Sequence, residues 1–200
     1  MIALIDYGSG NLRSVEKALL HIGAEVKLVD APEGLTDVDA VVLPGVGHFA
    51  DCATNLRSRG LWEPMQEWLK TGRPFLGICV GYQLLFEGSV EAPGVGGLGF
   101  FPGMVRKFAA TGIKVPQIGW NTLTTTPSPL WKGLPENPFV FFVHSYFPAP
   151  TNASVVSATA EYGESFAAAV SQGQVHGVQF HPEKSQSNGL RILQNFVESV

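Results

Sequence analysis

Apolar residues in the first half of the chain alternate between two patterns. Residues 2–5, 40–43 and 74–76 are short, continuous apolar runs, which is typical of strands buried on both faces of a sheet. Between these runs, apolar residues recur at helical spacing, first at Leu12, Val15, Leu19 and Ile22, and later at Trp62, Met65, Trp68 and Leu69. Repeated strand–helix–strand units predict an α/β fold with a mostly parallel central sheet flanked by helices.

The second half of the chain has a different pattern of residues. Residues 92–103 are rich in glycine and residues 124–138 in threonine, proline and glycine, with strand-like runs at 154–160 and 165–171. A helical pattern beginning near residue 187 closes the chain. These features predict hairpins added to the edge of the sheet, and a single domain over residues 1–200.

Composition narrows the class of protein. The chain has 200 residues, 45% of them hydrophobic, and a formal net charge of −4. Such a charge argues against nucleic acid or an anionic membrane surface as a partner. The N-terminus does not resemble a signal peptide, and no apolar run approaches the length of a membrane span. With two cysteines, one of them assigned a reactive role below, a reducing cytoplasm is the expected compartment, and Cys52 is interpreted as a small buried residue.

Cys79 is the candidate nucleophile. It lies in Gly77-Ile78-Cys79-Val80-Gly81, directly after an apolar run and before the helical stretch 82–86. A strand-to-helix turn of this kind holds a nucleophile in a strained, exposed position, and the helix N-terminus favours a thiolate.

His181 and Glu183 are the candidate base and orienting acid. Residues i and i+2 of an extended backbone point to the same side, so the Glu183 carboxylate can reach the imidazole of His181. Alone, this segment is better explained as a histidine in a turn at the end of a strand, beside a solvated acid. Together with Cys79, it predicts a nucleophile–base–acid triad.

Acyl transfer also requires donors for the developing oxyanion. The N–H of Val80 is one candidate, and the loop Gly45-Val46-Gly47 is the other. An ordinary glycine turn explains that loop about as well. His144 is a competing base, but it lacks a nearby acid and is interpreted as a core or supporting residue.

His21, His48 and His176 are interpreted as surface or packing residues. No cluster has metal-ligand spacing, so neither a metal nor a cofactor is predicted. A phosphate site at residues 8–11 is disfavoured, because the segment lacks the later glycine of a dinucleotide-binding loop.

These motifs resemble those of class I glutamine amidotransferases, whose fold is flavodoxin-like. Four further segments, residues 6–12, 43–47, 142–146 and 179–186, are similar to one branch, the glutaminase subunit of imidazole glycerol phosphate synthase. The resemblance runs in order along almost the whole chain.

The resemblance implies hydrolysis of glutamine to glutamate and ammonia through a thioester on Cys79. It further implies delivery of the ammonia to a (β/α)8-barrel cyclase partner, forming a heterodimer in histidine biosynthesis. By motif position, the residues that bind glutamine are Gln83, Glu91, Ser145 and Tyr146. The residues expected to face the cyclase are Asn11, Trp120 and Lys184.

The chain departs from the usual family pattern at Val80, Tyr82, Gln117 and Ile118, which leaves the triad untouched. Three alternatives stay open: the subunit of another synthase, a free-standing cysteine hydrolase of γ-glutamyl compounds, and a non-catalytic module. The tract 181–186 argues against the first, and an intact triad argues against the last.

Overall fold

The computed structural model describes residues 1–109 and 111–200, and eight of the strands formed by these residues make up one main sheet. Their order across the sheet is β2-β1-β3-β4-β13-β12-β11-β8. The strands are β1 (Ile2–Ile5), β2 (Val26–Val29), β3 (Ala40–Leu43), β4 (Phe75–Ile78), β8 (Thr124–Thr125), β11 (Val156–Glu161), β12 (Ser165–Gln172) and β13 (Val175–Val178).

The first five strands in this order are parallel, and the last three are antiparallel to their neighbours. All residues of β1, β3, β4 and β13 are buried, as continuous apolar strands covered on both faces must be. The predicted mostly parallel central sheet is confirmed. The β11–β12 hairpin at one end confirms an added edge hairpin.

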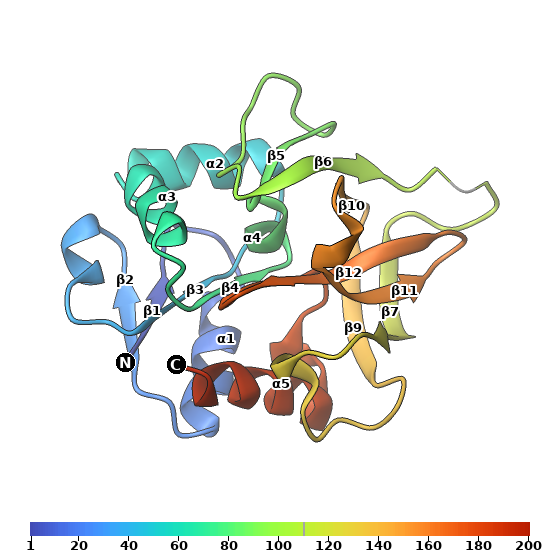
Figure 1. Ribbon diagram of the computed structural model, residues 1–200. Coiled ribbons are helices and arrows are strands. Elements are labelled where there is room, and N and C mark those ends of the chain that lie inside the picture. Colours follow the sequence, from blue (N-terminus) through green and yellow to red (C-terminus); the bar gives the residue numbers. More distant parts are fainter. Residues whose placement is uncertain (110) are drawn as a thin grey trace.

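Helices cover both faces of the main sheet (Figure 1). The five helices that the described residues form are α1 (Leu12–His21), α2 (Phe49–Ser58), α3 (Trp62–Lys70), α4 (Val80–Gln83) and α5 (Gln186–Glu198). From β1 the chain moves outward to β2 through α1, whereas from β3 it moves the other way to β4 through α2 and α3. Right-handed crossovers in opposite directions place α1 and the α2–α3 pair on opposite faces.

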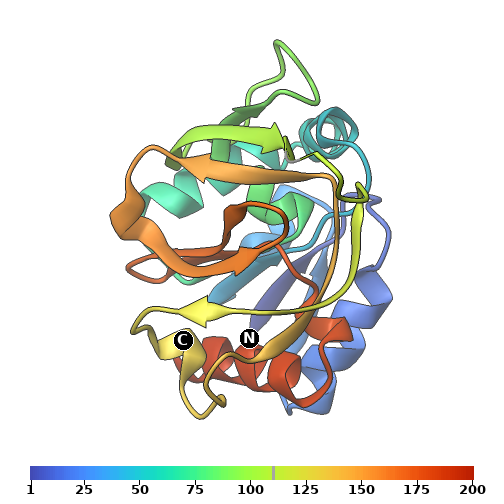
Figure 2. The same cartoon turned by 90° about the vertical axis from the view of Figure 1, so that its right-hand side faces the viewer.

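Two smaller sheets lie beside the main one (Figure 2). A three-stranded sheet has the order β10-β6-β5, and a two-stranded sheet pairs β7 with β9. Their bounds are β5 (Phe86–Ser89), β6 (Phe101–Lys107), β7 (Gln117–Thr122), β9 (Phe139–His144) and β10 (Tyr146–Pro150). Four 3₁₀ turns complete the described elements: η1 (Pro32–Leu35), η2 (Pro129–Trp131), η3 (Ala153–Val155) and η4 (Pro182–Lys184).

Two local predictions need correction, and one helix was missed. The helix after Cys79 ends at Gln83, not at residue 86, because Phe86 begins β5 and pairs with Phe101 of β6. The strand expected from residue 154 begins at Val156, after the turn η3. The helix α2 was not predicted.

Two glycines allow β4 and α4 to pack tightly around residue 79. A Cβ at Gly81 would overlap the carbonyl oxygen of Leu43, and one at Gly77 would lie 2.7 Å from the carbonyl oxygen of Gly81. A side chain at Gly81 would push the start of α4 away from β3, and one at Gly77 would push α4 away from β4. No helix among the described residues is long and apolar enough to cross a membrane.

Candidate active site

The candidate site lies at the carboxyl ends of four adjacent parallel strands. The loop after β1 carries Ser9 and Asn11, the loop after β3 carries Val46, β4 ends just before Cys79, and β13 leads to His181. The carboxyl ends of parallel strands share one edge of the sheet, so segments distant in sequence meet there.

Cys79 has the backbone strain expected of a nucleophile turn. Its φ is 55° and its ψ is −110°, a conformation that residues with a side chain rarely adopt. Its N–H donates to the carbonyl of Val178 at 2.8 Å, and Gln83 N–H donates to its carbonyl at 3.1 Å. Strand and helix together therefore hold the strained residue in place.

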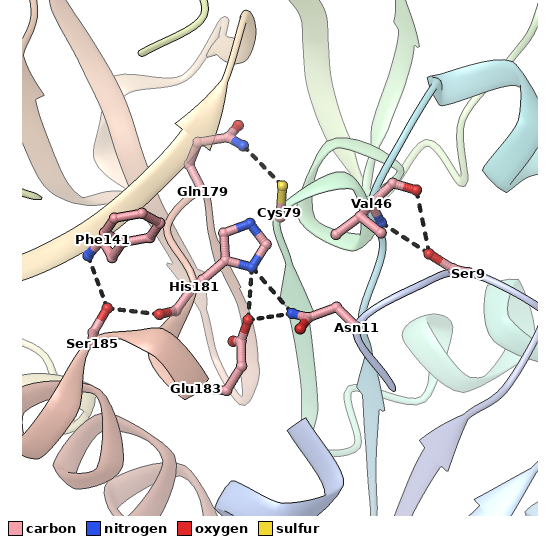
Figure 3. Close-up of polar contacts among 9 residues, drawn as sticks. All are labelled: Ser9, Asn11, Val46, Cys79, Phe141, Gln179, His181, Glu183 and Ser185. Carbon is pink, nitrogen blue, oxygen red and sulfur yellow. Dashed lines mark hydrogen bonds and ion pairs between the residues drawn. The ribbon is translucent and has the colours of Figure 1, made fainter. Parts of the chain in front are cut away.

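His181 and Glu183 form the predicted contact, but not on the extended backbone that the prediction assumed, because Pro182–Lys184 form the 3₁₀ turn η4. The Nδ1 of His181 lies 2.7 Å from Oε1 of Glu183, and their side chains are 2% and 0% exposed. In Figure 3 one side of the ring faces Glu183, and the other faces the side on which Cys79 lies. An N–H donated to Glu183 leaves the second ring nitrogen for proton exchange at the sulfur.

The environment of His181 favours the imidazolium. Burial lowers the pKa of His181, but hydrogen bonding and charge interactions with Cys79 and Glu183 outweigh it and raise the pKa to about 10. At neutral pH, His181 therefore holds a proton that it can deliver to a leaving group.

Asn11 belongs to this network, although the sequence assigned it to a partner surface. Its Nδ2 donates to Oε1 of Glu183 and lies 3.5 Å from Nδ1 of His181. Glu183 Oε1 thus accepts from both residues, which fixes the carboxylate against the ring.

A second chain of hydrogen bonds reaches the sulfur from the other side, and the sequence did not reveal it. Gln179 is fully buried, and its Nε2 lies 3.7 Å from Sγ of Cys79. The Oε1 of Gln179 accepts a hydrogen bond from Nε2 of Gln83 at 3.1 Å. This Gln83 nitrogen also donates to the carbonyl of Tyr146 at 3.0 Å. Gln179 is thereby oriented with its N–H toward the nucleophile.

A cavity of about 560 Å³ opens over Cys79. The four predicted glutamine-binding residues all line it: Gln83, Glu91, Ser145 and Tyr146. Oε2 of Glu91 accepts from the N–H of Phe49 at 2.9 Å, at the start of α2. This bond fixes one negative charge on the wall of the cavity.

The two predicted oxyanion donors are both engaged within the protein. Val80 N–H donates to the carbonyl of Gly45 at 3.1 Å, and Val46 N–H donates to Oγ of Ser9 at 2.9 Å. The Gly45 carbonyl and the Val46 N–H belong to one peptide group and point in opposite directions. That peptide therefore turns its acceptor toward the nucleophile turn. Its donor, the Val46 N–H, points to Ser9 (Figure 3).

Of the three residues expected to face the cyclase, two line the cavity and one does not. Lys184 lines it together with Asn11, whereas Trp120 is 46% exposed on β7 and lines a separate depression with Phe139. Cys52 is buried, as expected, and burial raises the pKa of its thiol, which donates to the carbonyl of Val46 at 3.6 Å.

The other histidines are placed as supporting residues. His144 lines the cavity, but its Nδ1 lies 2.9 Å from the carbonyl of Tyr146 and its Nε2 3.0 Å from the Gln117 amide. Burial lowers the pKa of His144 to about 4, and burial lowers that of His176 likewise. His48 caps α2, and His21 is exposed on α1. Within residues 1–109 and 111–200, no group of three or more His, Cys, Asp or Glu could hold a metal ion.

Comparison with known proteins identifies the class first. The family model of class-I glutamine amidotransferases matches residues 3–200. A solved structure titled as a glutamine amidotransferase superposes with a TM-score of 0.79 at 24% identity, covering 99% of this chain and 98% of its own. The chain therefore belongs to the class-I glutamine amidotransferase family.

Curated relatives narrow this to one branch. The imidazole glycerol phosphate synthase subunit HisH of Syntrophotalea carbinolica is 48% identical, with 98% of each chain covered. HisH of Moorella thermoacetica is also 48% identical, covering 100% of this chain and 95% of its own. Within the class, the chain belongs to the imidazole glycerol phosphate synthase subunit HisH family, and the resemblance seen in its motifs is confirmed.

Proposed function

We propose that the chain hydrolyses glutamine with a Cys79–His181–Glu183 triad and supplies the ammonia to a (β/α)8-barrel cyclase in histidine biosynthesis. The observation that carries this proposal is the buried His181 side chain, held by Glu183 at 2.7 Å in a cavity that it shares with Cys79 on a strained turn. Gathering these three groups is what acyl transfer requires.

The first half-reaction releases ammonia. The Cys79 sulfur attacks the carboxamide carbon of glutamine, and the carbonyl electrons move to the oxygen. When the tetrahedral intermediate collapses, the C–N bond breaks and His181 gives its proton to the leaving nitrogen. The products are ammonia and a thioester between Cys79 and the glutamyl group.

The second half-reaction restores the enzyme. Neutral His181 takes a proton from water as the water oxygen attacks the thioester carbon. Collapse of this intermediate breaks the C–S bond, releases glutamate and leaves the sulfur beside a protonated imidazole again. Glu183 keeps Nδ1 protonated throughout, so the opposite ring nitrogen handles both transfers.

The walls of the cavity suit the two ends of the substrate. Glu91 supplies a negative charge for the α-ammonium group of glutamine, and Gln83 borders the path to Cys79. Ser145 and Tyr146 line the wall that continues from β9 into β10. We assign these four residues to glutamine recognition.

Rotation of one peptide group completes the site. A half-turn of the Gly45–Val46 peptide removes the Gly45 carbonyl from the Val80 N–H and brings the Val46 N–H to the same side. Both donors then face the carbonyl oxygen of the substrate. The rotation changes ψ of Gly45 and φ of Val46. Gly45 has no side chain to restrict its torsion, and Gly47, with φ of 100°, gives the following residue freedom to adjust.

The sheet face formed by β7 and β9 is the proposed docking surface for the cyclase. Ile118, Trp120 and Phe139 are 63%, 46% and 57% exposed, a concentration of apolar side chains typical of protein interfaces. Val143, on β9, and Pro116, just before β7, line the active-site cavity. A partner seated here, in contact with Asn11 and Lys184 as well, would lie over the mouth of that cavity.

The proposal includes a heterodimer working in the cytoplasm, with residues 1–200 as one domain. The continuous core and the two unpaired, buried cysteines support it. A free-standing hydrolase is the competing function. It is disfavoured because both oxyanion donors are engaged internally when the chain is alone.

Two assays test the function. Glutamate formation is measured for the isolated chain and for its complex with the cyclase and the nucleotide ligand of the cyclase. We expect turnover to rise at least a hundredfold in the complex. Equal turnover without the cyclase would support the free-standing hydrolase instead.

The second assay uses Cys79→Ala in the complex. We expect glutamine hydrolysis to fall about a millionfold, while added ammonium still feeds the cyclase reaction. The ammonium-dependent rate is the internal control for folding and assembly. Residual glutaminase activity near that of the unmodified complex would refute the nucleophile assignment.

A further inference from the structure

Ser9 contacts the one peptide group whose orientation decides whether the oxyanion donors are available. Its Oγ accepts from the Val46 N–H at 2.9 Å and donates to the Val46 carbonyl at 3.4 Å (Figure 3). Thirty-seven positions separate the two residues in sequence. They meet because β1 and β3 are neighbours and both end at this edge.

The surroundings hold Ser9 in this position. A Cβ at Gly10 would lie 3.1 Å from Cγ2 of Val46, so the two loops are in close contact. The Val46 carbonyl also accepts a hydrogen bond from the Cys52 thiol at 3.6 Å. Val46 is therefore bonded on both its N–H and its carbonyl by side chains outside its own loop.

Rotation of the Gly45–Val46 peptide changes the hydrogen bonds of Ser9 unequally. In the observed orientation the hydroxyl makes two bonds, accepting one proton and donating another. After a half-turn, the Val46 N–H points away from the Ser9 hydroxyl and the Gly45 carbonyl takes its place. Two carbonyls then compete for the single proton of the hydroxyl, and its acceptor capacity goes unused. Ser9 thus loses one hydrogen bond when the peptide rotates.

We propose that Ser9 is a positioning residue that biases the Gly45–Val46 peptide toward the resting orientation and so restrains glutaminase activity when the cyclase is absent. This inference rests on the proposed function. It goes beyond that function by identifying Ser9 as the side chain that favours the resting orientation of the peptide. Because Ser9 makes one hydrogen bond fewer in the rotated orientation, removing its hydroxyl shifts the ratio of the two orientations by roughly three- to tenfold.

The test is Ser9→Ala in the isolated chain. We expect kcat for glutamine to rise roughly three- to tenfold with an unchanged KM, because glutamine contacts are unaffected and only the active fraction grows. In the complex, where the rotated state already dominates, the rate stays within about twofold of the unmodified rate. Ser9→Thr retains the hydroxyl and restores the low rate. Ser14→Ala, a serine on the exposed side of α1, is the matched control and leaves the rate unchanged.

Amide hydrogen exchange gives a readout that does not depend on activity. The Val46 N–H is expected to exchange roughly three- to tenfold faster in Ser9→Ala, because it loses its acceptor. An unchanged or lower isolated rate in a folded Ser9→Ala chain would overturn the inference, as would a Ser9→Thr chain as active as Ser9→Ala. If the unmodified complex hydrolyses no glutamine, the proposed function itself fails. If the complex is active and Ser9→Ala has no effect, only the role of Ser9 fails.

Discussion

The two halves of the candidate site are in different states. On one side of the sulfur, His181, Glu183 and Asn11 form a closed, buried network with a proton already on the imidazole. On the other side, the Gly45–Val46 peptide directs a carbonyl, not an N–H, toward the nucleophile turn. In the chain alone, the groups of the proposed triad are already brought together, whereas the donors of the proposed oxyanion site are engaged elsewhere.

This difference shows where control can be exerted at least cost. Dismantling a buried ion pair is expensive, because each charge left without its partner lacks both water and a counter-ion. Rotating one peptide beside Gly47 exchanges only a few hydrogen bonds. A partner that regulates ammonia release therefore acts most easily on the oxyanion side.

After Cys79→Ala, the largest expected effect tests the half of the site that contains His181 and Glu183. Glu183→Gln removes the charge that stabilises the imidazolium and allows the amide to present N–H groups to Nδ1, which disturbs the tautomer of His181. We expect kcat of the complex to fall about a thousandfold, measured by steady-state glutamate release. Glu136→Gln, an exposed acid on a loop, is the matched control and stays within about twofold. A loss of less than tenfold at residue 183 would remove Glu183 from the triad.

The oxyanion half is tested by Val46→Pro, which deletes the N–H at that position. In the complex we expect a hundred- to thousandfold loss of kcat, the usual consequence of removing one oxyanion donor. Val46→Ala keeps the N–H and should remain strongly activated by the cyclase. If proline at 46 left the activated rate intact, the rotating peptide would have no part in catalysis.

The smallest expected effect is on the stability of the fold. His181 and His176 contribute to this stability in opposite pH ranges. The raised pKa of His181 stabilises the fold below pH 6.5, and this contribution is lost as pH rises toward 10. The pKa of His176 is lowered by burial to about 4, so its contribution is present above pH 6.5 and lost as pH falls toward 4. Relative to His176→Asn, the unmodified chain should lose about 2 kcal/mol of unfolding free energy between pH 6.5 and 4. Urea unfolding at both pH values checks this, and parallel behaviour of the two chains would contradict it.

The sequence predicted the elements whose signals are local. Continuous apolar runs indicated the parallel strands. The contact between His181 and Glu183 was expected from the alternation of an extended backbone, but a 3₁₀ turn makes it instead. The helix α2 was missed although Phe49, Cys52, Ala53 and Leu56 follow helical spacing and are all buried. In contrast, the end of α4 could not be predicted, because pairing of Phe86 with a later strand overrides a helical pattern.

Three features of the site depend on long-range contacts that a single sequence does not display. Ser9 meets Val46, Asn11 meets Glu183, and Gln179 meets Cys79 only once the parallel strands are aligned. The orientation of the Gly45–Val46 peptide is even harder to predict from the sequence. Residue type indicates that a glycine loop can rotate, but the acceptors around it decide which way the peptide points.

The most direct test of the account compares chemical reactivity with turnover. Alkylation of Cys79 by iodoacetamide requires the activated sulfur but no oxyanion donor, whereas glutamine hydrolysis requires both. For the isolated chain and the ligand-bound complex, we predict alkylation rates within about threefold of each other and glutamine turnover at least a hundredfold higher in the complex. Alkylation that rose in parallel with turnover would show that the partner assembles the triad itself, and would contradict the account.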